Sequence, residues 1–405
     1  MKNKKAYNIY LLYSFATALF FALVFTVNMY YFVTVARLDP LQLVLVGTAL
    51  ELSVFIFEIP TGVVADSYSR RLSVIIGMFL IGIGFVTTAL FPSFIPILLA
   101  QLFWGVGYTF TSGAQQAWIT DEIGEEYATH AFLRGSQFEQ IGALLGTGLS
   151  VLLAAVYLTL PILTGGIMFF ILGIFLIVVM PEDGFTPTPT TERNSWQHLA
   201  SVFKQGFGMV SRRPALLAIL GVGFFYGLYS EGDDRLWTAS LLERFQFPPM
   251  FNLPDVTWFG ILAALALIFS AAGTEILQRR LKDPQPAVLA RTLMIVSALL
   301  VASLVGFVLT GSFVLAVVLY LAISILRTLA SPLYTSWVNH RLDSQVRATV
   351  ISMSSQVDAL GQISGGPVIG VIARQTSIGT GMLISSLLLS PVLLLLMKQV
   401  KAKEA

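Results

Sequence analysis

Apolar stretches of about 20 residues, the length of helix that spans the hydrocarbon core of a bilayer, recur along nearly the whole chain. Hydrophobic residues make up 56% of the sequence and charged residues only 11%, whereas a soluble domain is roughly 25% charged. We therefore predict an all-α integral membrane protein with twelve transmembrane helices. The predicted spans lie near residues 8–32, 42–64, 72–91, 95–118, 132–157, 161–180, 215–238, 257–277, 287–309, 312–335, 348–373 and 379–397.

The order of these spans predicts three parts along the chain. Residues 1–182 form one six-helix bundle, residues 183–213 a cytoplasmic linker and residues 214–405 a second six-helix bundle. The first apolar run is too long for a cleaved signal peptide, so it is predicted to be an uncleaved helix. In the linker, Trp196, Leu199, Val202, Phe203 and Phe207 recur at helical spacing, and this pattern predicts an amphipathic helix at the membrane interface.

The distribution of Lys and Arg predicts the orientation of the helices. The outer side keeps little beyond Arg37, Arg244 and Arg374 if both termini are cytoplasmic. This bias follows the positive-inside rule, so we expect a multi-pass protein of the cell (inner or plasma) membrane with both termini in the cytoplasm. The inner side then receives Lys2, Lys4, Lys5, Arg70, Arg71, Arg134, Lys204, Arg212, Arg213, Arg279, Arg280, Lys282, Arg341, Arg347, Lys398, Lys401 and Lys403.

The two predicted bundles contain an internal repeat. Asp66 with Arg70 and Arg71 is echoed 209 positions later by Glu275 with Arg279 and Arg280. Matches farther along the chain have an offset of 219 instead of 209, and one insertion before Trp337 accounts for the difference of ten. Parallel repeats of this kind suggest two pseudo-symmetric bundles that rock about a central site. At the offset of 219, Trp118 matches Trp337, Gln137 matches Gln356, Glu139 matches Asp358, Gly142 matches Gly361 and Gly146 matches Gly365.

Missing residue types exclude several functions. The chain has no cysteine and only three histidines, His130, His198 and His340, so disulfides, thiolate metal sites and a metalloprotease site are not expected. No Gly-Lys pair occurs, which argues against a phosphate-binding loop and direct ATP drive. No cluster of basic and aromatic residues points to nucleic acid. We expect no metal and no cofactor, and an enzyme is not expected, although a membrane-embedded hydrolase remains the alternative from a different class.

The loop between the second and third spans resembles the signature loop of the major facilitator superfamily. The pattern Gly-x-x-x-Asp-x-x-x-Arg-Arg is filled by Gly62, Asp66, Arg70 and Arg71, while Ser67 and Ser69 depart from the usual Arg and Gly. The resemblance covers essentially the whole chain and implies the major facilitator fold, with alternating access driven by a proton gradient. Within this superfamily, the segments 112–121, 230–237 and 347–350 resemble the bacterial drug-efflux branch that includes tetracycline-resistance-type proteins.

The resemblance implies that the signature loop is a gate at the cytoplasmic edge. Asp66, beside Arg70 and Arg71, is expected to latch one half of the protein against the other in a single conformation. Glu275 with Arg279 and Arg280 is the degenerate counterpart. The alternative is that the arginines serve only as topology anchors.

Carboxylates within the spans are candidates for proton coupling. A charge at mid-bilayer costs on the order of 2.5–3.5 kcal/mol, so it normally has a partner or faces a polar cavity. Burial favours the neutral form of a carboxyl group, and a proton carrier needs this property. Arg327 is the one deep cation and is predicted to be a counter-charge or an anchor for an anionic group. Asp233, Asp234 and Arg235 could instead be solvated at the outer interface, and Glu51 and Glu58 could serve only neighbours in the bundle. The coupling candidates are Glu231, Asp358, Glu139, Glu51, Glu58 and Asp234.

Polar and aromatic residues of several spans are candidates for a wide, largely apolar substrate cavity. For each aromatic residue, packing or interface anchoring is the competing interpretation. These candidates are Asn28, Tyr31, Gln101, Trp104, Tyr108, Tyr226, Tyr229, Gln137 and Gln356.

Together these features predict a secondary transporter, expected to be a monomer, that exports amphiphilic small molecules in exchange for protons. Two departures from the family pattern weigh against antiport. Gln101 precedes Trp104-Gly-Val-Gly107 without the usual Arg, and the glycines of the fifth span lack the proline that Pro367 supplies in the eleventh. The alternative is proton-coupled uptake of an anionic nutrient or siderophore with Arg327 as the anchor.

Overall fold

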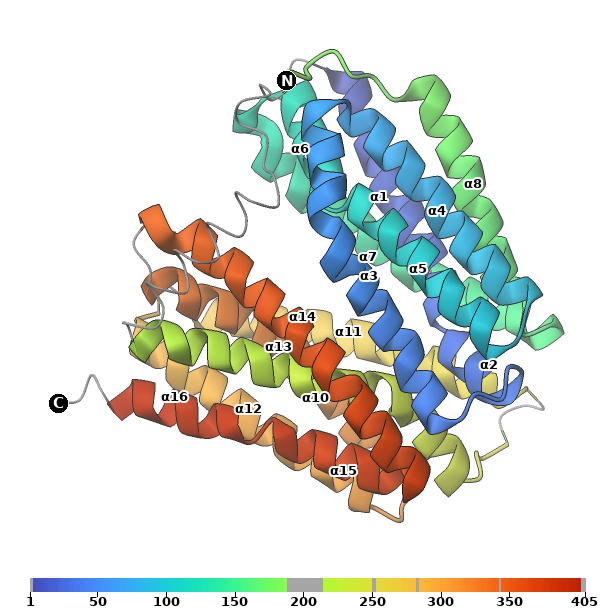
Figure 1. Ribbon diagram of the computed structural model, residues 1–405, viewed down its shortest axis with the longest axis vertical. Helices are drawn as coiled ribbons and strands as arrows, with labels where there is room; N and C mark the ends of the chain where they lie inside the picture. Colours follow the sequence, from blue (N-terminus) through green and yellow to red (C-terminus); the bar gives the residue numbers. More distant parts are fainter. Residues whose placement is uncertain (1–2, 188–213, 250–252, 282–283, 342–343, 402–405) are drawn as a thin grey trace. The chain divides into compact units, whose positions relative to one another are not determined.

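The computed structural model describes residues 3–187, 214–249, 253–281, 284–341 and 344–401, and helices make up nearly all of these stretches (Figure 1). Pro161, Pro286 and Pro391 stand in the first turns of their helices, where a missing N–H costs nothing. The helices are α1 (Lys4–Phe25), α2 (Asn28–Thr34), α3 (Pro40–Ser67), α4 (Arg70–Leu90), α5 (Phe94–Thr111), α6 (Ala114–Ile123), α7 (Glu125–Val156), α8 (Leu160–Val179), α10 (Pro214–Arg244), α11 (Val256–Arg280), α12 (Pro286–Leu309), α13 (Phe313–Arg341), α14 (Ser344–Gln375), α15 (Ile378–Leu388) and α16 (Pro391–Lys401).

The twelve predicted helices are confirmed, although three of them are interrupted. The first is divided into α1 and α2, the fourth into α5 and α6, and the last into α15 and α16. Gly113 separates α5 from α6 with a φ of +73°, a conformation that favours glycine. Among the described helices, ten spans are long and apolar enough to cross a membrane, and α10 and α14 are not among them. The predicted amphipathic helix lies in 188–213, outside the described residues.

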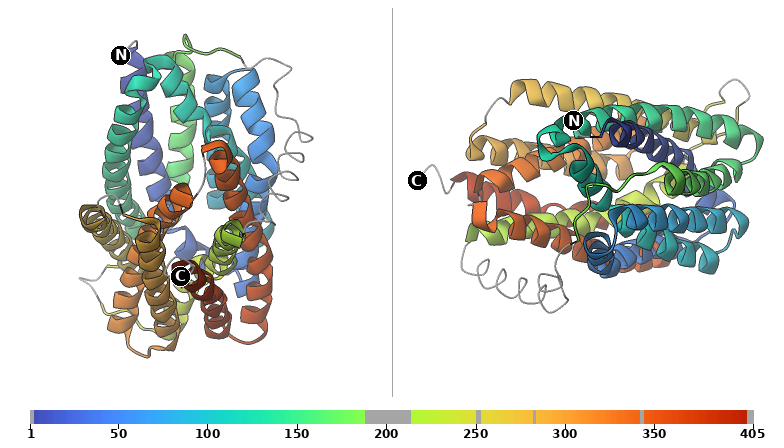
Figure 2. Two further views of the ribbon diagram at one scale, coloured as in Figure 1. Left: turned by 90° about the vertical axis from the view of Figure 1, so that its left-hand side faces the viewer. Right: turned by 90° about the horizontal axis from the view of Figure 1, so that it is seen from above.

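The helices divide into two compact units. Unit 1 comprises Met1–Leu38, Ala49–Trp196 and Pro249–Ile261, and unit 2 comprises Asp39–Thr48, Gln197–Pro248 and Leu262–Ala405. The units differ from the two predicted bundles in two places. The start of α3, residues 39–48, belongs to unit 2, and residues 249–261, which include the start of α11, belong to unit 1. Within each unit the long helices run side by side, as the views in Figures 1 and 2 show.

The same packing order occurs in both units, in agreement with the predicted repeat. In unit 1, α1 packs along α7, and α4 packs along α5 and α8. In unit 2, the corresponding helix α10 packs along α14, and α12 packs along α13, α15 and α16. The two halves of the chain therefore share the order of their helix contacts as well as the matched residues.

Glycines allow the closest of these contacts. A Cβ at Gly142 of α7 would strike the carbonyl oxygen of Phe15 in α1, and a Cβ at Gly361 of α14 would strike that of Phe224 in α10. Phe224 follows Phe15 by the same 209 positions that separate Glu275 from Asp66. Small residues let membrane helices approach until their backbones touch, so the glycines matched by sequence occupy matched positions in the two units.

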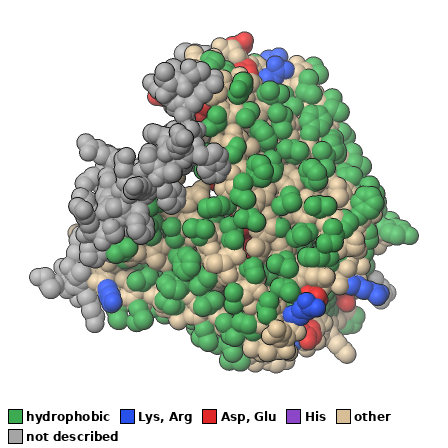
Figure 3. Space-filling model, viewed as in Figure 1, with side chains coloured by type: hydrophobic (Ala, Val, Ile, Leu, Met, Phe, Trp, Pro, Cys, Tyr) green, Lys and Arg blue, Asp and Glu red, His purple; other side chains and the backbone are tan. Residues whose placement is uncertain are grey.

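Large apolar side chains cover the outside of the helices. Leu152, Val156, Val178 and Val314 are each at least two-thirds exposed. On the face drawn in Figure 3, hydrophobic side chains spread over most of the described surface, and charged side chains gather near its margins. An apolar exterior of this kind is matched to lipid rather than to water.

Replacing Gly142 with Ala is expected to loosen the α1–α7 contact, because the new methyl group meets a backbone carbonyl that cannot rotate away. Overpacking typically costs about 1–3 kcal/mol, so the midpoint of thermal unfolding in detergent should fall. Gly148→Ala is the matched control, since a Cβ at Gly148 of the same helix meets nothing within 4 Å. Equal midpoints for the two variants would contradict close packing at Gly142.

Candidate functional site

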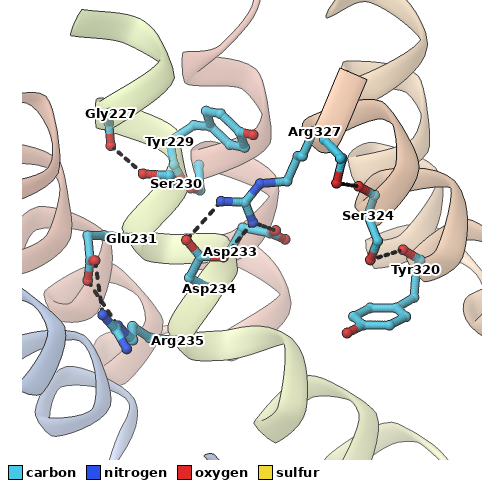
Figure 4. A network of polar contacts seen from close by, with 12 residues as sticks. Gly227, Tyr229, Ser230, Glu231, Asp233, Asp234, Arg235, Tyr320, Ser324 and Arg327 are labelled. Carbon is cyan, nitrogen blue, oxygen red and sulfur yellow. Dashed lines mark hydrogen bonds and ion pairs between the residues drawn. The ribbon is translucent and has the colours of Figure 1, made fainter. Parts of the chain in front are cut away.

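Four charged residues lie close together on α10, in the middle of unit 2. Glu231, Asp233, Asp234 and Arg235 occupy one and a half turns of this helix. Because successive residues are rotated about 100° around a helix, the four side chains do not share one face. Figure 4 shows Asp233 and Asp234 directed toward Arg327 of α13, with Glu231 and Arg235 on another side of α10.

Arg327 pairs with both aspartates. Its Nη2 donates to Asp234 Oδ2 at 2.8 Å, and its Nη1 donates to Asp234 Oδ1. The same Nη1 also lies 3.3 Å from Asp233 Oδ2. The guanidinium carbon lies 5.7 Å from the ring centre of Tyr229, so the cation also rests against an aromatic face.

Glu231 and Arg235 form a separate ion pair one helical turn apart. Arg235 Nε and Nη2 donate to the two Glu231 oxygens at 3.2 and 3.3 Å, and the Glu231 side chain is only 2% exposed. Gly47, at the start of α3 and in the same unit, adjoins this pair, and a Cβ there would strike both charged groups. A two-point contact to a guanidinium compensates the buried carboxylate.

A cavity of about 450 Å³ lies between α10, α13 and α14 of unit 2. Tyr334 and Ser354 in its wall share a hydrogen bond, and Gln362 Nε2 donates to Asp358 Oδ2 at 2.8 Å. Most of the lining side chains carry a hydroxyl, amide or charged group, so polar groups are distributed over a wall that also exposes much apolar surface. It is lined by Gly223, Tyr226, Tyr229, Ser230, Asp234, Arg327, Ala330, Ser331, Tyr334, Thr335, Val338, Ile351, Ser354, Ser355, Asp358 and Gln362.

A second cavity of about 270 Å³ lies farther along α10 and α13. Its wall includes Asp233 and the stacked rings of Trp237 and Tyr320, whose centres are 4.4 Å apart. Asp234 and Arg327 line both cavities. The ion pair between them is therefore shared by the two spaces.

Both cavities have more carboxylates than guanidiniums. Asp234 and Asp358 face the larger cavity and Asp233 and Asp234 the smaller one, whereas Arg327 is the only basic residue among the described residues of the two linings. A neutral or positively charged ligand is therefore electrostatically favoured over an anion. An anion would have to displace a carboxylate from Arg327.

The structure brings together several of the residues that the sequence singled out in the second half of the chain. Asp234, Arg327, Asp358 and Tyr226 line the larger cavity, and the Tyr226 hydroxyl lies 2.8 Å from Ser297 Oγ. Tyr229 is 1% exposed and packs beneath Arg327. Glu231 is buried outside both linings, and Gln356 is half-buried on α14.

Asp233 is the residue of this cluster that the sequence placed least well. Solvation at the outer interface was one interpretation of Asp233, but the residue is only 7% exposed and lies against Arg327. Its neighbour Asp234 takes the two-point contact with the same guanidinium, and on the other side of the sequence Gly232 packs against Ser385 of α15. The coupling candidates predicted from the sequence include Asp234 but leave Asp233 out.

In unit 1, the candidate residues near α5 belong to an aromatic cluster. Trp104 Nε1 donates to the buried Gln101 Oε1 at 2.7 Å, and its ring packs against Phe25 and Phe85. Phe25 and Tyr108 are each 43% exposed. In unit 1, exposed aromatic rings therefore lie near the buried Gln101, whose side-chain oxygen already accepts a hydrogen bond.

Tyr31 is fully buried, and its hydroxyl donates to the carbonyl oxygens of Thr88 and Ala89 in α4 at 3.0 and 3.2 Å. These contacts make Tyr31 part of the packing of unit 1, so we leave it out of the proposed substrate site. Asn28 begins α2 at the interruption of the first span and is half-buried.

The acidic candidates of unit 1 lie on two helices. Glu51 and Glu58 are on α3, where Glu51 is half-buried and Glu58 exposed. Glu139 is half-buried on α7, and the exposed Gln137 nearby accepts a 3.0 Å hydrogen bond from Arg134. These residues belong to unit 1 and are not among the residues that line the two cavities of unit 2.

The signature loop connects α3 to α4 and has partners that the sequence did not indicate. Arg70 lies 3.8 Å from Asp66 and forms a closer ion pair with Asp121 of α6. Glu182 accepts hydrogen bonds from Ser69 Oγ at 2.6 Å and from the Arg71 backbone N–H at 2.9 Å. A carboxylate at this helix N-terminus is favoured by the helix dipole.

The space around Gly62 is open, since a Cβ there would meet nothing within 4 Å. Asp121 and Glu182 follow the fourth and sixth predicted spans, so only the folded chain brings them to the loop. The latching role of Asp66 stays a prediction. Its repeat counterpart Glu275 accepts a 2.6 Å hydrogen bond from Arg279, and both side chains are more than half exposed.

Replacing Arg327 with Gln is expected to destabilise unit 2, because two carboxylates lose their cation. Removing one partner of a fully buried ion pair costs about 3–5 kcal/mol and an exposed pair contributes about 0–1 kcal/mol, so the partly exposed Arg327 cluster should fall between these values. Arg279→Gln, which breaks the exposed Glu275 pair, is the matched control. In thermal unfolding, the midpoint should fall for Arg327→Gln alone, and adding Asp234→Asn should restore part of it. No recovery in the double variant would argue against charge compensation.

Comparison with known proteins agrees with this architecture. Residues 9–366 match the family model described as Major Facilitator Superfamily. YxaM of Bacillus subtilis (strain 168), an uncharacterized MFS-type transporter, is 24% identical over 339 residues, which are 83% of this chain and 81% of YxaM. The crystal structure of the nucleoside transporter NupG has a TM-score of 0.76 at 17% identity, over 97% of this chain and 98% of NupG.

A bacterial homologue of the human lysosomal transporter Spinster has a TM-score of 0.74 at 14% identity, over 98% of this chain and 96% of that one. At these identities the structural matches show the shared fold alone. The family match covers most of the chain, including the signature loop and the charged residues of α10 and α13 described above. The chain therefore belongs to the Major Facilitator Superfamily and is a multi-pass secondary transporter.

Proposed function

We propose that this transporter couples the movement of protons to the export of small amphiphilic molecules whose polar part is neutral or cationic. The observation that carries the proposal is the excess of carboxylates over guanidiniums among the described residues that line the two cavities of unit 2. An uncompensated carboxylate within a span favours uptake of a positive charge, either a proton or a cationic substrate. Transport would proceed by alternating access of the two repeats.

The lining of the larger cavity supports a substrate with a polar end. Ser331, Thr335 and Ser355 are exposed side chains in this lining, and each can donate and accept a hydrogen bond. The rings of Tyr226 and Tyr334 in the same lining suit an apolar part. The substrate class therefore rests on the larger cavity of unit 2 alone.

Export is favoured by the resemblance of segments 112–121 and 230–237 to the drug-efflux branch of the superfamily. Uptake of an anionic nutrient is less well supported, because Arg327 already pairs with two carboxylates. A second candidate follows from the hydroxyl-rich cavity, namely proton-driven uptake of a polar, hydroxylated molecule. The nucleoside transporter NupG, which has the same fold, makes nucleosides the natural probes for this candidate.

Inside-out membrane vesicles that contain a fluorescent pH probe test both candidates. With an acidified lumen, tetraphenylphosphonium or ethidium should release protons if the protein exchanges cations for protons. With no preformed gradient, uridine added outside should acidify the lumen if the protein is a symporter. The opposite signs of the two responses separate export by antiport from uptake by symport.

Asp358→Asn should weaken the response to the two cations by about tenfold in apparent affinity, which corresponds to about 1.4 kcal/mol, because it removes a negative charge from the larger cavity. Glu275→Gln, at an exposed position outside the cavities, is the control and should leave the response unchanged. If no compound in either set changes the luminal pH, proton-coupled transport of these substrate classes is wrong.

A further inference from the structure

The two aspartates that share Arg327 are not equivalent. Asp234 binds both terminal nitrogens of the guanidinium, which is the strongest arrangement available to an Arg–carboxylate pair. Asp233 has one contact at 3.3 Å, to a nitrogen that Asp234 already occupies. One guanidinium therefore serves one carboxylate well and the other poorly.

Asp233 is also the more buried of the two. Its side chain is 10% exposed, whereas that of Asp234 is 41% exposed. Asp233 lines only the smaller cavity, while Asp234 lines both. Asp234 can thus be hydrated from two spaces, and Asp233 from one.

The other groups around Asp233 offer no second cation among the described residues of this lining. Tyr320 of α13 faces the smaller cavity, and Tyr229 lies on the other side of Arg327. Phe307 of α12 contributes an apolar ring to the lining. The charged groups that face Asp233 are therefore Arg327 and Asp234, and with both aspartates ionised the three groups together carry one negative charge.

Electroneutrality in the bilayer then requires one more positive charge. Two carboxylates beside one guanidinium in a medium of low dielectric constant leave one charge uncompensated, and such a charge costs several kcal/mol. A proton is the smallest ion that removes this cost. The smaller cavity has room for several water molecules, each of which takes up about 30 Å³ in the liquid, so water fits beside Asp233.

We propose that Asp233 is the residue that binds the coupled proton in unit 2, with Asp234 as the permanent partner of Arg327. This assignment rests on the proton coupling proposed above. When Asp233 is protonated, Arg327 binds Asp234 alone and the pair shared by the two cavities is complete. When Asp233 loses its proton, it competes with Asp234 for Arg327, which weakens that pair.

Two other acids of unit 2 fit this role less well. Glu231 has its own guanidinium, with contacts from two Arg235 nitrogens. Asp358 is half-buried in the larger cavity and accepts a hydrogen bond from Gln362. A balanced or hydrated carboxylate has less need of a proton than one that is buried and shares its cation.

Infrared spectroscopy of the purified full-length protein in lipid tests the assignment without a substrate. The protein is made with ¹³C at the side-chain carboxyl carbon of aspartate, which lowers the C=O stretching frequency of a protonated Asp but not of a protonated Glu. A change of pH should produce a difference band at the labelled position. In Asp233→Glu the band should move to the unlabelled position, because the proton now resides on Glu.

Asp234→Glu is the matched control, since it also exchanges one acid for the other at the neighbouring position, and its band should stay at the labelled position. A band that stays labelled in Asp233→Glu, or moves in Asp234→Glu, overturns the assignment, as does an unlabelled band or no band in the unaltered protein. If Asp233→Glu does not fold, Asp233→Asn decides, because persistence of the band there has the same meaning.

These outcomes are distinct from failure of the proposed function. A labelled band that depends on Asp233 supports the assignment as a proton site even when no compound changes the luminal pH of the vesicles. Conversely, vesicles that show proton-coupled transport together with a band independent of Asp233 place the proton elsewhere and leave the transport proposal intact.

Discussion

The contact of Arg327 with two aspartates is the interaction on which the polar interior of unit 2 depends. It joins α10 to α13, lies at the boundary of both cavities and sets the sign of the charge within them. A single guanidinium cannot compensate two ionised carboxylates, so with both aspartates ionised the cluster carries one uncompensated negative charge. The choice of substrate and the binding of protons are both proposed consequences of this imbalance.

The fold supports this cluster through helix contacts that recur in both units. Gly142 and Gly361 allow equivalent helix pairs to touch at their backbones, which holds α10 close to α14 as α1 is held close to α7. The repeats have nevertheless diverged in their chemistry. In unit 1, α5 contributes Gln101 and Trp104 to an aromatic cluster, whereas α13 in unit 2 contributes Arg327.

The signature loop illustrates how a recognisable pattern can hide its partners. Gly62, Asp66, Arg70 and Arg71 are contiguous enough to identify from sequence, but Asp121 and Glu182 bind this loop from positions more than fifty residues away. Acid–base pairs across such separations have no spacing rule. Only helix packing brings them within reach of each other.

The sequence alone determined the membrane environment, the number of spans and the repeat, because these depend on the length and order of apolar stretches and on residue identities at constant offsets. It also identified Asp234 and Arg327 as notable charges, since a charge in a span is costly wherever it lies. The tertiary structure decided which acids share the cation, that Tyr31 is buried in packing and which hydroxyl and charged side chains line the larger cavity. The rotation of each helix about its axis sets these features, and it is determined by packing against neighbouring helices, which hydropathy does not encode.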